Sequence, residues 1–199
     1  MNVAILKYNA GNVFSVECAL KRIGIEAKIT DNINEIINAD KVIFPGVGEA
    51  SSAMDYLHAK NLDKLIIGLR QPVLGICIGL QLMCKHSEEG DTNCLGIFNT
   101  NVKKFDSNLS SPEMKIPHTG WDTISEIKTN GFLSNEFNSK YVYYVHSYYA
   151  ALCDETIATT EYITKFSAAL QKDNFYATQF HPEKSGSIGE AILKQFIEL

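Results

Sequence analysis

The sequence lacks the patterns that mark several common classes of protein. Its five cysteines include no CxxC pair, which argues against a thiolate zinc site, and they are too scattered and odd in number for a disulfide framework. No window approaches the roughly 18 consecutive apolar residues of a transmembrane helix. We therefore expect reduced thiols, no metal centre and no membrane contact. The cysteines are Cys18, Cys77, Cys84, Cys94 and Cys153.

Signals for nucleic acids, nucleotides and export are missing as well. The chain carries 18 basic and 23 acidic residues, a net charge of −5, with no Lys or Arg run longer than a pair, so a nucleic-acid surface is not expected. Neither a GxGxxG nor a GxxxxGK[ST] pattern occurs. The first residues lack the basic region and cleavage-like site of a signal peptide. We expect a cytoplasmic protein without a cofactor.

The first half of the chain has the pattern of an α/β domain. Its 199 residues, 45% of them hydrophobic, can form a full core without a disulfide or metal, so we expect one domain spanning residues 1–199. Strand-like apolar runs alternate with helical spacing at residues 13–23 and 49–69, the second of which Asn61 and Gly68 can interrupt. This alternation predicts a parallel sheet with helices on both faces. The strand runs are residues 3–6, 26–29, 42–44 and 72–76.

After about residue 95 the pattern changes to β-branched and aromatic runs, which predict mixed or antiparallel strands. A closing amphipathic helix is predicted at residues 185–198, and loops at residues 86–93 and 107–112. The chain should therefore form a central, mixed but mostly parallel sheet. The later strand runs are residues 102–105, 121–124, 141–145, 149–152, 157–160 and 175–179.

The segment GICIGLQ, residues 75–81, lies where a buried strand has to turn into a helix. Glycines two residues before and after Cys77 allow a sharp turn that lifts the thiol out of the sheet. At a helix N-terminus the unpaired amides and the dipole favour a thiolate, and the Ile78 amide would face an oxyanion formed beside the sulfur. A buried cysteine between closely packed glycines is the alternative interpretation of this motif alone.

A base for this thiol is available in the segment FHPEK, residues 180–184. Pro182 disfavours helix at His181 and fixes the geometry between the imidazole and the Glu183 carboxylate. In a Cys, His and acid set, the histidine takes the thiol proton and later returns it, while the acid orients the ring. By itself the segment is more typical of the exposed start of a helix, where Glu183 serves the helix dipole. Its combination with the elbow favours the catalytic interpretation.

A third glycine-rich segment, PGVG at residues 45–48, follows a predicted strand. In an open parallel sheet the carboxyl ends of the strands form the ligand-binding edge. Glycines at this edge let a backbone amide turn toward a bound substrate, so the segment is a candidate second oxyanion donor. An ordinary connection between a strand and a helix is the alternative.

The elbow and the HPE segment resemble the signatures of class I glutamine amidotransferases, which release ammonia from glutamine through a cysteine thioester. Five further segments resemble one branch of that family, the glutaminase subunits of imidazole glycerol phosphate synthase. Essentially the whole chain is covered. The resemblance implies a flavodoxin-like α/β fold, L-glutamine as substrate and a separate (β/α)8 cyclase partner, which combines the ammonia with a phosphoribulosyl formimino nucleotide in histidine biosynthesis. The segments are residues 9–16, 45–48, 118–122, 143–149 and 177–186.

The resemblance also implies roles for single residues. Cys77 is the implied nucleophile, His181 the general acid and base, and Glu183 the residue that orients it. The amides of Val47 and Ile78 are the implied oxyanion donors. The implied substrate-binding residues are Gly48, Gln81, His146, Ser147 and Tyr148, and the implied residues at the partner interface are Asn12, Trp121 and Tyr144.

Simpler interpretations of several of these residues stay open. Trp121 is equally a packed core aromatic, the tyrosines of residues 141–149 an ordinary aromatic strand, and His146 a turn histidine. Members of the family usually have Tyr-Gly where this chain has Asn9-Ala10, in a loop that faces the partner. Two other functions also remain: a related subunit that supplies ammonia for surface sugars, and a stand-alone cysteine hydrolase of the same fold.

Overall fold

The computed structural model describes residues 1–8, 12–109, 114–129 and 131–199, so the departure at Asn9-Ala10 lies outside the described residues. Its central sheet has seven strands in the order β11-β12-β13-β4-β3-β1-β2. Neighbours among β2, β1, β3, β4 and β13 pair in parallel. β12 pairs antiparallel with β13, and β11 pairs antiparallel with β12. The predicted mixed, mostly parallel sheet is confirmed. The strands are β1 (Val3–Leu6), β2 (Ala27–Thr30), β3 (Lys41–Phe44), β4 (Val73–Ile76), β11 (Thr156–Glu161), β12 (Lys165–Lys172) and β13 (Phe175–Thr178).

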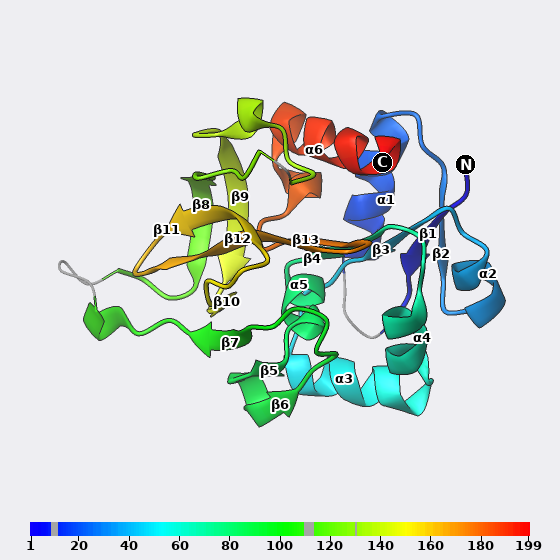
Figure 1. Ribbon diagram of the computed structural model, residues 1–199, viewed down its shortest axis with the longest axis horizontal. Helices are drawn as coiled ribbons and strands as arrows, with labels where there is room; N and C mark the ends of the chain where they lie inside the picture. Colours follow the sequence, from blue (N-terminus) through cyan, green and yellow to red (C-terminus); the bar gives the residue numbers. More distant parts are fainter. Residues whose placement is uncertain (9–11, 110–113, 130) are drawn as a thin grey trace.

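Helices cover both faces of this sheet (Figure 1). One face packs against α1 (Val13–Arg22) and α6 (Gly186–Glu198), and the other against α3 (Ala50–Ala59), α4 (Leu62–Gly68) and α5 (Ile78–Met83). A short helix, α2 (Ile33–Ile37), packs on the second face through Ile36.

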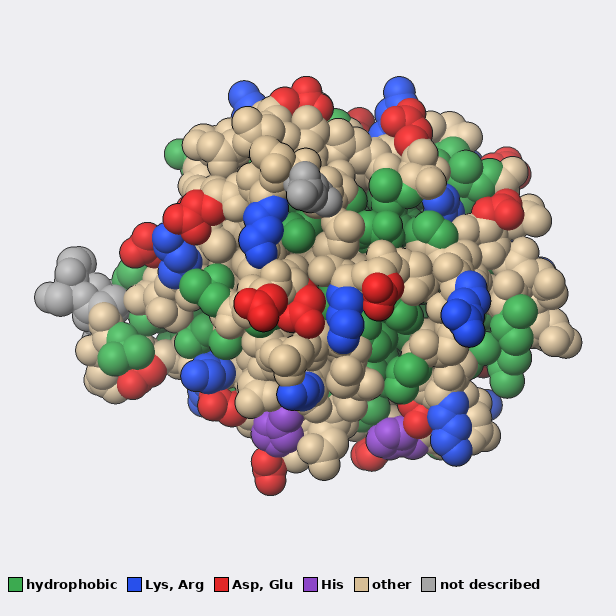
Figure 2. All heavy atoms as spheres, viewed as in Figure 1, with side chains coloured by type: hydrophobic (Ala, Val, Ile, Leu, Met, Phe, Trp, Pro, Cys, Tyr) green, Lys and Arg blue, Asp and Glu red, His purple; other side chains and the backbone are tan. Residues whose placement is uncertain are grey.

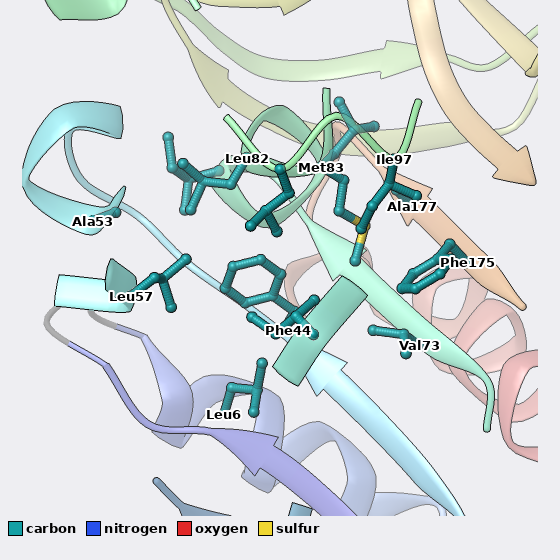
Figure 3. Packing of buried hydrophobic residues seen from close by; sticks show 14 of the residues in the cluster. Leu6, Phe44, Ala53, Leu57, Val73, Leu82, Met83, Ile97, Phe175 and Ala177 are labelled. Carbon is teal, nitrogen blue, oxygen red and sulfur yellow. The ribbon is translucent and has the colours of Figure 1, made fainter. Parts of the chain in front are cut away.

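Two buried cores result from the alternation of side chains along the strands. Leu6 and Phe44 point into the core shown in Figure 3, together with Leu57 of α3. Their chain neighbours Ile5 and Ile43 point into the opposite core beside α1 and α6. Both faces of the central strands are therefore apolar, which explains the unbroken apolar runs of the first half of the sequence.

Two small sheets flank the central one. The first joins β10 (Tyr148–Ala150), β7 (Asn101–Lys104), β5 (His86–Ser87) and β6 (Thr92–Asn93), and the second pairs β8 (His118–Thr123) with β9 (Tyr141–His146). The expected loop at residues 86–93 is wrong, because β5, the 3-10 turn η1 (Glu89–Asp91) and β6 fold it into a hairpin. Further 3-10 turns are η2 (Ser107–Leu109), η3 (Asn135–Phe137) and η4 (Pro182–Lys184).

The helical pattern at residues 49–69 forms two helices rather than one. Asn61 adopts a φ of 55°, a left-handed conformation that asparagine tolerates better than most residues, and α4 starts at the next residue. The alternation of strands and helices implied a helix between β2 and β3 without locating α2, and no pattern indicated β12. Of the residues described, no helix is long and apolar enough to cross a membrane. On the face that Figure 2 shows, acidic and basic side chains are intermixed.

Candidate active site

The strand-to-helix turn at Cys77 places its thiol at the carboxyl edge of the central sheet. Cys77 has a φ of 53°, a strained conformation for a residue with a side chain, and it immediately precedes α5. The turn is held by hydrogen bonds from the Cys77 amide to the Thr178 carbonyl, 2.8 Å, and from the Gln81 amide to the Cys77 carbonyl, 3.2 Å. A Cβ atom at Gly79 would overlap the carbonyl oxygen of Phe44, so only glycine lets α5 approach β3 this closely.

His181 and Glu183 form a buried pair in the segment between β13 and α6. Nδ1 of His181 lies 2.8 Å from Oε1 of Glu183, and both side chains are 1% exposed. Strand β9 holds this segment, because the His181 amide donates to the Tyr143 carbonyl and the Tyr143 amide donates to Oγ of Ser185. Ser185 in turn donates to the His181 carbonyl, 2.6 Å. The backbone of His181 is thus held by Tyr143 and Ser185, and its ring is oriented by Glu183.

The electrostatics of this pair favour a charged imidazole. Burial lowers the pKa of His181, but the neighbouring Cys77 sulfur and the Glu183 carboxylate outweigh it and raise the pKa to about 10. Nε2 of His181 is buried and has no hydrogen-bond partner among the described residues. Catalytic hydrogen bonds are often long or poorly aligned before substrate binds, and a proton on Nε2 is available to a leaving group.

Asn12 also contacts the acid of this set. Its Nδ2 donates to Oε1 of Glu183 over 3.0 Å, so the same carboxylate oxygen accepts from both Asn12 and His181. The sequence placed Asn12 at a partner interface, and the structure adds a direct hydrogen bond to the candidate triad. Asn12 therefore also orients Glu183.

Other groups that contact the Cys77 sulfur had no motif to identify them. Gln179 donates through Nε2 to Sγ over 3.7 Å, and the sulfur lies 4.0 Å from the Val145 carbonyl. Tyr8 is buried nearby, donates to the Pro45 carbonyl over 2.6 Å, and has its pKa raised by burial and by the charge of Cys77. Because these contacts join segments far apart in the chain, only the fold brings them together.

The remaining thiols sit in less reactive surroundings or away from the pocket. Burial raises the pKa of Cys84 and Cys153, and raises that of Cys94 to about 12. Cys18 is exposed on α1. A thiol reagent at neutral pH should therefore modify Cys77 and Cys18 before the other three.

A pocket of about 270 Å³ opens beside Cys77, a size suited to a single amino acid. All of the predicted oxyanion and substrate-binding residues line it, while their roles remain predictions. Among the residues that the structure describes, Glu89 contributes the one acidic side chain of the lining, and it lies in the segment that was expected to be a loop. A larger hollow of about 480 Å³ lies at the amino ends of β1 and β2 and contains no cysteine or histidine. The first pocket is lined by Val47, Gly48, Cys77, Ile78, Gln81, Glu89, Pro117, Val145, His146, Ser147 and Tyr148.

The predicted interface residues separate into exposed and buried ones. Trp121 is 55% exposed, which excludes the core interpretation of this residue. Tyr144 is fully buried and its hydroxyl contacts Oγ1 of Thr160, so its assignment to an interface is wrong. The neighbouring Tyr143 points the other way, with its ring 6.0 Å from that of Trp121 and 5.8 Å from Nζ of Lys184. Side chains alternate along β9, and the outward position falls on Tyr143.

Comparison with known proteins agrees with this geometry. Residues 5–199 match the family described as glutamine amidotransferase class-I. The chain belongs to the class I glutamine amidotransferases. This amidotransferase is 58% identical to a protein of Bacteroides thetaiotaomicron named imidazole glycerol phosphate synthase subunit HisH, with all of both chains covered. A protein of the same name from Idiomarina loihiensis is 42% identical over 100% of this chain and 98% of its own.

Solved structures show the same fold. A glutamine amidotransferase structure superimposes with a TM-score of 0.73 at 18% identity, covering 98% of this chain and 97% of its own. One from Thermotoga maritima gives 0.65 at 18% identity, covering 99% and 80%. The amidotransferase therefore has the fold of its family, and the expected fold class is confirmed.

Proposed function

We propose that this amidotransferase is the glutaminase subunit of an imidazole glycerol phosphate synthase, acting in the cytoplasm with a separate cyclase subunit. The observation that carries the chemistry is the buried set of Cys77, His181 and Glu183 at the edge of an amino-acid-sized pocket. Full-length similarity to proteins named as that subunit supports the histidine-pathway assignment.

The first half of the proposed reaction forms a thioester. The Cys77 thiolate attacks the side-chain amide carbon of L-glutamine, and the negative charge moves to the amide oxygen. The amides of Val47 and Ile78 stabilise that oxyanion. His181 gives its Nε2 proton to the leaving nitrogen, the carbon–nitrogen bond breaks, and ammonia departs.

The second half releases glutamate. His181, now neutral, takes a proton from a water molecule that attacks the thioester carbon. The second oxyanion collapses, the carbon–sulfur bond breaks, and the thiolate and imidazolium are restored. Glu183 keeps Nδ1 protonated throughout, so that Nε2 remains the nitrogen that exchanges protons.

Glu89 is suited to bind the α-ammonium group of glutamine. Its carboxylate is half-buried in the pocket lining, and Oε2 accepts a hydrogen bond of 2.8 Å from the Ala50 amide at the start of α3. Burial raises the pKa of Glu89, and the Ala50 hydrogen bond opposes this shift. The α-ammonium group of the substrate would place a positive charge beside the Glu89 carboxylate and form a charge-assisted hydrogen bond with it.

Replacing Glu89 with glutamine should raise KM for L-glutamine by roughly 10-fold to 100-fold, because a charge-assisted contact is lost. The amide oxygen of the new side chain can still accept from Ala50, so the hairpin should remain folded. Kinetics with glutaramate, which lacks the α-ammonium group, provide the discriminating measurement. Glu88→Gln is the matched control, because Glu88 accepts from the Lys104 amide and does not line the pocket. An equal loss with both substrates would contradict this role.

The face that carries Trp121, Tyr143 and Lys184 is the proposed docking surface for the cyclase. Trp121 is largely exposed, and the Lys184 ammonium lies against the Tyr143 ring. Because the Tyr143 backbone also holds the His181 segment, a partner that moves this strand acts directly on the triad. Asn12 offers a second connection, through its hydrogen bond to Glu183.

A reconstitution assay tests the proposed function. The purified chain, the cyclase subunit from the same genome and the phosphoribulosyl formimino nucleotide are mixed with L-glutamine, and imidazole glycerol phosphate is measured. We expect glutamine to serve as the nitrogen source for this synthesis when the concentration of ammonium salts is low. If ammonium salts support synthesis and glutamine does not, the histidine-pathway assignment is wrong. The surface-sugar alternative then gains support if the chain still hydrolyses glutamine.

A further inference from the structure

A line of buried polar groups runs from β8 into the substrate pocket. Nδ1 of His118 lies 3.2 Å from Nε2 of His146, and Nδ1 of His146 lies 2.8 Å from the carbonyl oxygen of Tyr148. The same carbonyl accepts a hydrogen bond of 2.8 Å from Nε2 of Gln81. His146 and Gln81 both line the pocket, whereas His118 is not among its lining residues.

The direction of these hydrogen bonds follows from the group at the inner end. A carbonyl oxygen only accepts, so Nδ1 of His146 carries the proton and donates to Tyr148. Burial, with smaller contributions from His118 and His181, lowers the pKa of His146 to about 3 against the effect of the Tyr148 carbonyl. The His146 ring is therefore neutral, and its Nε2 has a lone pair. Nδ1 of His118 must be the donor to that lone pair.

The His118 ring is held in one orientation. It is stacked between Tyr144, at 4.8 Å, and Tyr162, at 3.9 Å, with interplanar angles of 17° and 11°. Its far nitrogen, Nε2, lies 3.4 Å from Oδ2 of Asp122, and the side chain is 4% exposed. The stacking between the two tyrosines therefore directs Nδ1 toward His146.

The Tyr148 carbonyl determines which atom of the Gln81 side chain remains available to the substrate. One amide hydrogen of Gln81 goes to the Tyr148 carbonyl and the other to Oε1 of Gln179, 3.1 Å away. The only polar atom that remains is the acceptor Oε1, which suits an ammonium group rather than a carboxylate. If the Tyr148 carbonyl turned away, the side-chain amide of Gln81 could rotate. Its N–H groups would then compete with Oε1 for the position that faces the substrate.

We propose that His118 is a positioning residue for glutamine recognition, fixing the Tyr148 carbonyl through His146 and thereby the orientation of the Gln81 amide in the pocket. The inference rests on the proposed glutaminase function. It concerns binding of the substrate's amino-acid end and leaves the nucleophile and its base unchanged.

The test compares variants of His118 in the complex with the cyclase. His118→Phe keeps a ring between Tyr144 and Tyr162 but has no N–H group. We expect KM for L-glutamine to rise about tenfold, with kcat changed by less than about twofold, as for loss of a contact that aids ground state and transition state alike. His118→Asn, which places an N–H near the position of Nδ1, should recover most of the KM.

Two controls separate positioning from general damage. The first control is alkylation of Cys77 by iodoacetamide, measured in a Cys18→Ala background. This reaction does not depend on the position of the Tyr148 carbonyl, so it should proceed at the parent rate in His118→Phe. His58→Phe removes the histidine from another histidine–aspartate contact, in which Nε2 of His58 lies 3.8 Å from Oδ2 of Asp63. Neither residue lines the pocket. This variant should leave KM unchanged.

A double-mutant cycle tests the route through His146. His146→Asn keeps a donor for the Tyr148 carbonyl but removes the ring nitrogen that accepts from His118. This variant should raise KM about tenfold by itself, and adding His118→Phe should raise it no further. An unchanged KM in both single variants, or fully additive effects, overturns the inference. A failure of the proposed function looks different, because the parent complex then releases no glutamate at any glutamine concentration.

Discussion

Replacing Cys77 with alanine should reduce glutamine hydrolysis by about 10⁴-fold or more, with or without the cyclase. Cys77 supplies the only thiol among the described residues of the pocket lining, and both half-reactions pass through its sulfur. Alanine tolerates the positive φ of this turn no worse than cysteine does, so the elbow and the docking surface should persist. Glutamate release at saturating glutamine measures the effect, and co-purification with the cyclase checks the fold.

A control variant and the relative activities of two further variants test the assigned roles. Cys18→Ala removes an exposed thiol from α1 and should keep the parent rate. His181→Ala should be nearly as inactive as Cys77→Ala, whereas Glu183→Gln should retain about 10²-fold more activity than either. The amide oxygen of that glutamine can still accept from His181 and Asn12. An active Cys77→Ala variant, or the reverse order of the other two, would contradict the assigned roles.

The local signals in the sequence were sufficient for the parallel strands of the central sheet and for the elbow. Strands buried on both faces have to be apolar, so β1, β3 and β4 were visible as apolar runs, that of β3 ended by Pro45. The turn at Cys77 needs glycine where α5 meets β3, and that requirement appears in the sequence as Gly79. Such features depend on residues adjacent in the chain, which makes them predictable from it.

The contacts that complete the site are not local, and sequence patterns missed them. Asn12 and Glu183 are 171 residues apart, and Gln179 and Cys77 are 102 apart. Glu89 reaches the pocket only because its hairpin folds against α3. No periodicity encodes such pairings, since they arise when the sheet places distant segments at one edge.

The error at Tyr144 has a similar cause. In the run Tyr141 to Val145 every residue favours a strand, and a shift of one residue exchanges the inward and outward faces. The apolar and aromatic side chains do not show which tyrosine is outward. Pairing with β8 decides it, placing Tyr143 opposite Trp121. The corrected surface keeps the predicted Trp121 and replaces its tyrosine.

The isolated chain should hydrolyse glutamine slowly, and the cyclase with its bound nucleotide should raise the rate by about 10²-fold or more. The physical reason lies in the segment after β3. Gly48 has a φ of 139°, a conformation that residues with side chains rarely adopt, and the Val47 amide donates no hydrogen bond to the described part of the chain. This amide is therefore free to point toward the oxyanion or away from it.

One absent oxyanion donor lowers the rate by about 10² to 10³-fold, so a partner that favours the inward orientation supplies a gain of that size. Glutamate production with and without the cyclase and its nucleotide measures the gain. Val47→Pro, which lacks the N–H, should lower the rate of the complex to about that of the isolated chain. Full activity of the isolated parent chain would exclude this gating and favour the stand-alone hydrolase.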